Sequence, residues 1–452
     1  MAISRVFDIA RRSLSVYQSA LTVTSHNVAN ANNPAYSRQR VLLATENPSK
    51  ASALTIGAGV KIDDIVRVRD QMIDTQIRKF TQTESLYNKQ NEIYSKLEVL
   101  LSEPSELGLS SLITSFFNSW SELSANPTSV ELRNNIVNNG KQLTNRFNEL
   151  YQGYNKIRTE LKNEAVQITT EINSFVGQIN TLNRQIFEAK SRGITPNDLM
   201  DERDRVIDEL SQLVNVNVYQ DDNGSTNVSI GGILAVDQYH NLDFKIVEEN
   251  GKLYLKDGSG ESSLNITEGE LGAILKSYST DIPSFLNSLD SVAEKISSTV
   301  NEIHQTGYTY TNPPQTGFNF FQQYEKGAFA IDPAVLNDVR LISASADGTD
   351  GNNSIAIKIA GLKDEKTIGG LTFLDKYSSF VSDMASYKNM VEKNSESYQM
   401  ILEELDYQKA SNSSVSIDEE MMDVLKYQKS YDASAKLISI ADRLIETLLA
   451  MV

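Results

Sequence analysis

The chain has 452 residues, no cysteine and a formal charge of −17 at neutral pH. Its length predicts two to four domains at roughly 150 residues each, and its 40% hydrophobic and 22% charged residues are ordinary for a folded protein. The acidic balance argues against a nucleic-acid partner, and the missing cysteines exclude disulfides, thiolate catalysis and Cys-ligated zinc. Nine prolines are fewer than half of average usage, which favours long uninterrupted helices.

The hydropathy pattern indicates no membrane span, because no run of about 18 apolar residues occurs. Arg5, Asp8, Arg11 and Arg12 stand where a cleavable signal peptide would have its apolar core. We therefore expect neither a transmembrane helix nor a cleaved export signal.

Both ends of the chain show the seven-residue repeat of a coiled-coil helix. The N-terminal seam consists of Phe7, Leu14, Leu21 and Val28. The C-terminal seam consists of Ile417, Val424, Tyr431, Ile438, Ile445 and Val452. Residues 1–40 carry a charge of +4 and residues 415–452 a charge of −3, which favours pairing of the two ends with each other or with neighbouring copies. The alternative is two ordinary helices packed on a core.

Between the ends, the pattern predicts a chain that runs outward and returns. A seven-residue repeat from Leu143 to Ala189 predicts a helix of more than 40 residues, and β-branched alternation from Val214 predicts strands. The expected fold class is mainly α, with long helices, a terminal coiled coil and a small inserted β domain. The expected units are a terminal coiled-coil domain (1–40 and 415–452), a helical middle domain (41–213, 268–306 and 373–414), a β insert (214–267) and a mixed or irregular outer segment (307–372).

No pattern of a catalytic, cofactor or metal site occurs in the sequence. His26, His240 and His304 lie in different predicted units, and none has the i, i+4 partner of a helical zinc site. The acidic loops 220–227 and 347–353 lack the carboxylate alternation of a calcium loop and are predicted as turns. We expect a protein that is not an enzyme and needs no cofactor.

The first helix ends in an Asn-rich stretch that runs into a strand-like segment. Residues 26–41 read His-Asn-Val-Ala-Asn-Ala-Asn-Asn-Pro-Ala-Tyr-Ser-Arg-Gln-Arg-Val, in which Asn and Pro supply the helix stop and the turn. The stretch resembles the signature of the bacterial flagellar axial proteins, and Tyr-Ser-Arg-Gln narrows the resemblance to the hook-associated proteins. The motif residues are Asn27, Ala29, Asn30, Pro34, Tyr36, Ser37 and Arg38.

Further segments extend this resemblance over nearly the whole chain. Among them are Leu-Met-Asp-Glu-Arg-Asp at 199–204 and Asp-Glu-Glu-Met at 418–421, in family order. The resemblance implies a structural adaptor that joins hook to filament, with terminal helices in an inner tube and middle domains facing outward. It also implies a location in the extracellular flagellum after type III export without a cleaved signal peptide.

The implied partners are hook protein, hook-associated protein 3, an export chaperone at the C-terminal helix, and further copies in a helical oligomer, the free chain being a monomer. One alternative is a sister axial protein, either hook protein or hook-associated protein 3 itself. A second is a cytoplasmic coiled-coil scaffold, which would keep stable, ordered ends as a purified monomer.

Overall fold

A computed structural model describes residues 2–33, 35–46, 49–50, 55–221 and 225–450. The helices are α1 (Ala2–Ala29), α2 (Gln71–Leu101), α3 (Leu109–Ala125), α4 (Val130–Ser191), α5 (Asn197–Leu213), α6 (Gly269–Lys276), α7 (Ile282–His304), α8 (Pro333–Asn337), α9 (Ser354–Gly361), α10 (Phe373–Ser413) and α11 (Ile417–Ala450). The strands are β1 (Gln39–Thr45), β2 (Ser49–Lys50), β3 (Thr55–Ile56), β4 (Val60–Arg67), β5 (Val216–Gln220), β6 (Thr226–Ile230), β7 (Ile233–Val236), β8 (Phe244–Glu249) and β9 (Lys252–Asp257). The expected fold class, mainly α with paired terminal helices and small sheets, is confirmed.

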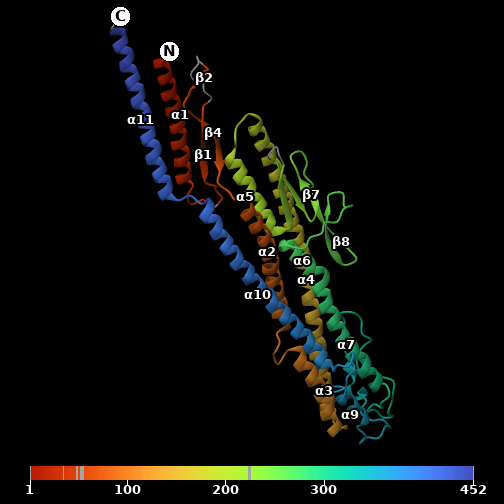
Figure 1. Cartoon of the computed structure of the whole chain (residues 1–452). Helices are drawn as coiled ribbons and strands as arrows, with labels where there is room; N and C mark the ends of the chain where they lie inside the picture. Colours follow the sequence, from red (N-terminus) through yellow and green to blue (C-terminus); the bar gives the residue numbers. More distant parts are fainter. Residues whose placement is uncertain (1, 34, 47–48, 51–54, 222–224, 451–452) are drawn as a thin grey trace.

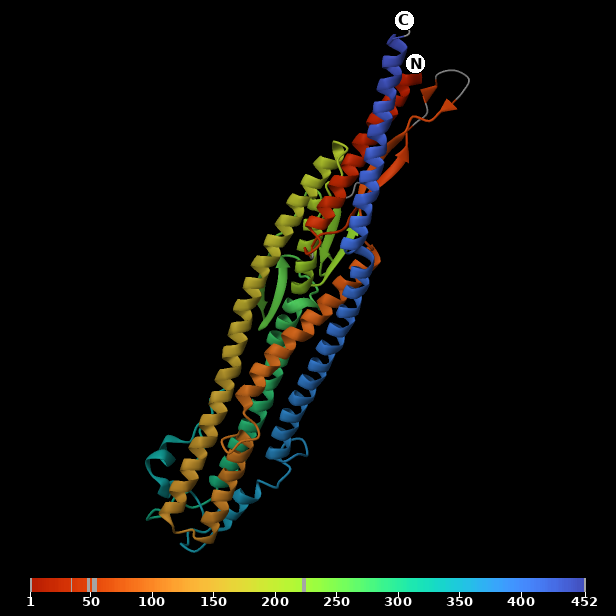
Figure 2. The ribbon, with the colours of Figure 1, turned by 90° about the vertical axis from the view of Figure 1, so that its left-hand side faces the viewer.

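The middle of the molecule is a rod of long helices. The 62-residue helix α4 begins at its N-cap Ser129, whose hydroxyl accepts the Leu132 N–H, and is about 93 Å long at 1.5 Å per residue. Helices α2, α7 and α10 run beside it, and one continuous apolar core joins them (Figures 1 and 2). In the described part of the chain, no helix is both long and apolar enough to cross a membrane.

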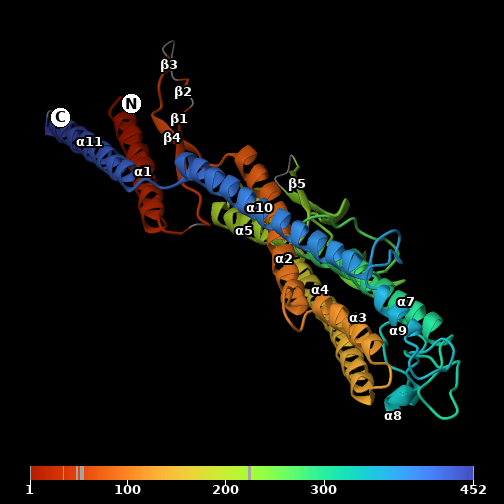
Figure 3. The same ribbon diagram turned by 90° about the horizontal axis from the view of Figure 1, so that it is seen from below.

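The two ends of the rod differ. At one end, α1 and α11 form an antiparallel pair that stands beyond the rod and whose residues are not part of its core (Figures 1 and 3). At the other end, α3, α8, α9 and the loops of residues 307–372 form a tip around buried aromatic rings. The sheets β5-β6-β7 and β8-β9 lie along the side of the rod, on α4.

The expectation of a helical middle domain from residue 41 is wrong for residues 41–67. These residues contain the antiparallel pair β1–β4, which packs on α1. β4 holds four β-branched residues, Val60, Ile62, Ile65 and Val66, which favour a strand, and a register shift between Leu42 and Leu43 bends the pair. Strand propensity and the surface of α1 therefore decide the structure here.

A buried histidine of α7, His304, connects two loop segments of the tip by hydrogen bonds. The His304 ring donates from Nδ1 to the Phe318 carbonyl (2.7 Å) and accepts the Ser343 N–H at Nε2 (2.9 Å). A backbone N–H can only donate, so the ring must be neutral in this arrangement. Burial lowers the pKa of His304 to about 4.

We expect the tip to lose stability as the pH falls from 6.5 towards 4. The unfolded chain binds the His304 proton near pH 6.5 and the folded chain only near 4, so stability that is fully present above pH 6.5 is lost across this window. The loss should amount to roughly 3 kcal/mol, measured by urea unfolding at several pH values. His304→Gln keeps one donor and one acceptor but cannot titrate in this range. An equal pH dependence in wild type and variant would contradict the prediction.

Candidate functional site

The predicted motif residues meet at the joint between the α1–α11 pair and the rod. Asn27, on the last turn of α1, is 2% exposed. Its Oδ1 accepts the Tyr36 hydroxyl (2.7 Å) and the Gln39 N–H (2.9 Å). Its Nδ2 donates to the Gln39 carbonyl (2.9 Å) and to Oε2 of Glu420 (2.9 Å). Asn27 therefore holds the start of β1 against the end of α1 and contacts α11 as well.

Arg38 makes a second connection from the motif to α11. Its Nε donates to Oε1 of Glu420 (2.7 Å), and its Nη1 donates to Glu419 (2.8 Å). The Glu420 side chain is 2% exposed, so its charge is buried and depends on these partners. Burial, and next the charges of Asp198, Asp201 and Glu420, raise the pKa of the Tyr36 phenol, which keeps its hydroxyl a donor.

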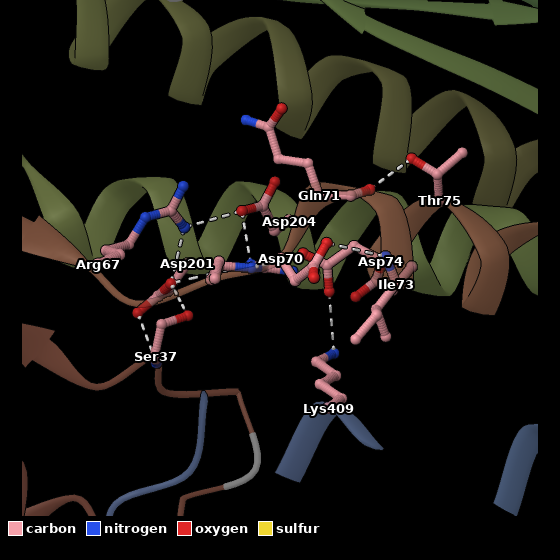
Figure 4. A network of polar contacts seen from close by, with 12 residues as sticks. Ser37, Arg67, Asp70, Gln71, Ile73, Asp74, Thr75, Asp201, Asp204 and Lys409 are labelled. Carbon is pink, nitrogen blue, oxygen red and sulfur yellow. Dashed lines mark hydrogen bonds and ion pairs between the residues drawn. The ribbon is translucent and has the colours of Figure 1, made fainter. Parts of the chain in front are cut away.

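Ser37 connects the motif to the rod through α5 (Figure 4). Its N–H and Oγ both donate to the Asp201 carboxylate, at 3.0 and 2.6 Å. Arg67, at the end of β4, donates to Asp201 (2.7 Å) and to Asp204 (2.8 Å). One buried carboxylate on α5 thus holds both the motif and the β1–β4 pair.

The charged network continues from Asp204 into the rod (Figure 4). Arg69 bridges Asp204 (2.6 Å) and Asp74 of α2 (2.8 Å), and Lys409 of α10 lies 3.5 Å from Asp74. Burial alone would raise the pKa of Asp204, but Arg69, Arg67 and Arg78 outweigh it and lower the pKa. Because these charges are paired with one another, the network is suited to fixing the relative positions of α2, α5, α10 and the motif.

The other motif residues have simpler environments. Asn30 closes α1, since its N–H and its Nδ2 both donate to the His26 carbonyl (3.1 and 3.0 Å). Ala29 is exposed at the end of the helix, and Pro34 lies outside the described residues.

The predicted N-terminal seam lies beside the buried stripe of α1 rather than on it. Phe7, Leu14, Leu21 and Val28 are half-buried. From residue 4 onward, the buried residues of α1 are Ala10, Val16, Ala20, Thr24 and Asn27.

The predicted C-terminal seam is covered only in its middle. Val424, Tyr431 and Ile438 are half-buried, whereas Ile417 and Ile445 are 53% and 37% exposed, and Val452 lies outside the described residues. Tyr427 of α11 stacks on Tyr17 of α1 with ring centres 6.4 Å apart. The end of α11 extends past the start of α1 (Figure 1).

The partners of the motif were missing from the sequence-based prediction. Glu420 and Asp201 lie in the two acidic segments that carry the family resemblance, but no spacing rule links them to residues 27–38 across 164 or more positions. Neither these residues nor the rest of the described chain contain a group of three or more His, Asp or Glu side chains that could hold a metal ion.

Comparison with known proteins identifies the family. Residues 94–321, half of the chain, match the model of the flagellar hook-associated protein FlgK helical domain. The chain belongs to the FlgK family. Residues 408–451, which include α11, match the C-terminal model of the flagellar basal body rod FlgEFG proteins. This family member is therefore a flagellar component, as its terminal motif indicated.

Relatives cover this FlgK-family chain almost from end to end. Flagellar hook-associated protein 1 of Bacillus subtilis is 29% identical over 97% of this chain and 96% of its own. The Salmonella typhimurium protein of the same name is 24% identical over 99% of both chains. The solved flagellar hook junction protein FlgK from Burkholderia pseudomallei shares the fold, with a TM-score of 0.66 and 14% identity over 76% of this chain and all of its own.

Proposed function

We propose that the chain is a non-enzymatic adaptor that joins hook to filament by helical self-assembly through α1 and α11. Hook protein would lie on one side and hook-associated protein 3 on the other, outside the cell. The relatives named hook-associated protein 1 support this role.

The observation that carries the proposal is the apolar surface of α11. Seven large apolar side chains of α11, spread along the helix and over more than half of its circumference, are about half exposed or more: Met421, Met422, Leu425, Leu437, Ile440, Leu444 and Leu449. Such a surface is unusual for a monomer and marks an interaction site, since its burial contributes about 25 cal/mol per Å². Neighbouring copies related by one repeated contact would cover it and would form a helical array.

The same surface supports the proposed export chaperone. An α11 whose exposed apolar side chains are uncovered before assembly needs a partner to keep it from aggregating, and an amphipathic helix fits a groove of such a partner. Export without a cleaved signal peptide, in an unfolded state, agrees with a chain that has no disulfide to break.

We expect Leu425→Asp with Leu444→Asp to stop assembly without unfolding the chain. Both side chains are more than half exposed, so the free chain tolerates the charges, whereas a buried interface does not. A strain that carries this variant in place of wild type should make complete hooks, lack filaments and release filament subunits and the variant chain into the medium. Deletion of residues 417–452 should also stop assembly and leave the rod folded.

The matched control is Gln428→Asp with Ser439→Asp, which adds the same charges at exposed polar positions of α11. Normal filaments with the leucine variant would refute assembly through this face. Loss of the hook itself in a strain without the chain would favour the hook-protein alternative, and intact motility would favour the scaffold.

A further inference from the structure

The apolar residues of α1 and α11 do not by themselves define how far one helix is shifted along the other. Apolar residues recur every seven positions on both helices, and several buried positions are small, among them Ala10, Ala20 and Ala441. A shift of α11 by seven residues, about 10.5 Å, would again bring apolar residues opposite apolar residues. Something else must select one register.

A buried polar pair breaks this repetition near the joint. Asn27 and Glu420 are each 2% exposed and hydrogen-bonded to each other. Both oxygens of Glu420 have a partner, Asn27 for one and Arg38 for the other. The amide of Asn27 makes all four of its hydrogen bonds, and because the Gln39 N–H can only donate, Oδ1 must face Gln39 and Nδ2 must face Glu420 and the Gln39 carbonyl. This arrangement fits one register alone.

We propose that Glu420 is the positioning residue that sets the register of α11 on α1. In any shifted register it loses Asn27 and Arg38, and an unpaired buried carboxylate is strongly unfavourable. By fixing register, Glu420 also fixes the height along α1 at which the exposed side of α11, with Met421 and Leu425, stands. The last step, that this side meets neighbouring copies, rests on the proposed function.

The linker Ser414–Ser416 is the rival determinant, because it ties α11 to the end of α10. The experiment therefore separates the two by inserting Gly-Ser-Gly after Ser414. Since the chain has no cysteine, Gln18→Cys and Lys429→Cys, both exposed, provide one spin-label site on each helix. Pulsed EPR then measures the distance between the labels in the full-length chain, diluted with unlabelled chain.

With Glu420 present, we expect one narrow distance that the longer linker leaves unchanged. Glu420→Leu with the longer linker should add populations displaced by about 10 Å while helix content is kept. The matched control is Asp423→Leu, which removes the same charge three residues away; in the described structure Asp423 bonds to Lys426 of its own helix (3.4 Å). It should keep the single distance.

A single unchanged distance in Glu420→Leu, or a distance that moves with the linker alone, would overturn the proposal. So would a loss of helix content in Glu420→Leu, since Glu420 would then hold α11 in place without selecting its register. The distance measurement needs no assembly, so its failure is distinct from that of the proposed function, which the filament assay tests.

Discussion

Replacing Asp201 with alanine is expected to lower the free energy of unfolding by about 3–5 kcal/mol. Asp201 is 6% exposed and accepts three hydrogen bonds, two from Ser37 and one from Arg67. Its removal leaves the Arg67 guanidinium partly unpaired in a buried place and frees the Ser37 N–H, and unsatisfied buried groups account for most of such losses. Urea unfolding followed by far-UV circular dichroism measures the change.

The control is Asp63→Ala. Asp63 is 60% exposed and lies 3.9 Å from Lys61, so its removal should change stability by no more than about 0.5 kcal/mol. A loss below about 1 kcal/mol for Asp201→Ala would mean that water replaces its bonds and that the joint is not held by this carboxylate.

Replacing Phe320 with alanine should destabilise the tip by about 3–5 kcal/mol. The ring is fully buried among Phe116, Trp120 and Phe321, with centres 4.8 to 5.5 Å away. Its loss leaves a cavity that the neighbouring rings cannot close without breaking their own edge-to-face contacts.

The chain's single tryptophan reports this change directly. Trp120 is one of the rings around Phe320, so its fluorescence follows unfolding of the tip. The control is Phe187→Ala, at a 36% exposed position of α4, which should lower the free energy of unfolding much less. An equal loss of unfolding free energy in the two variants would contradict close packing of the tip.

The sequence predicted the helices well where one face is apolar over many turns. The repeat from Leu143 to Ala189 indicated a helix of more than 40 residues, and α4 contains that whole segment. The repeat continues because each turn adds an apolar contact to the same core, so local pattern and tertiary packing agree. A strand-like segment was predicted after the Asn-rich stretch, but residues 41–67 were assigned to the helical domain, because short strands carry a weaker signal than long helices.

The paired termini were predicted as elements, but the predicted N-terminal seam is not the most buried stripe of α1. The heptad residues Leu14 and Leu21 are half-buried, whereas Ala10 and Ala20 are fully buried. A large residue at a repeated position and a small one beside it are both compatible with a coiled coil, and only the partner helix decides which of them lies at the closest approach.

By itself, the sequence determined the fold class, the two amphipathic terminal helices, the Asn-rich motif and the absence of disulfides. Only the tertiary structure decided what the motif does, because Asn27, Ser37 and Arg38 act on Glu420 and Asp201, 164 to 393 positions away. Hydrogen bonds between distant segments leave no period in the sequence, whereas burial of one helix face does. The net charge of −17 shows the same division. By itself it argued against a nucleic-acid partner, but only the fold shows that Glu420 and Asp201 are buried and paired at the joint.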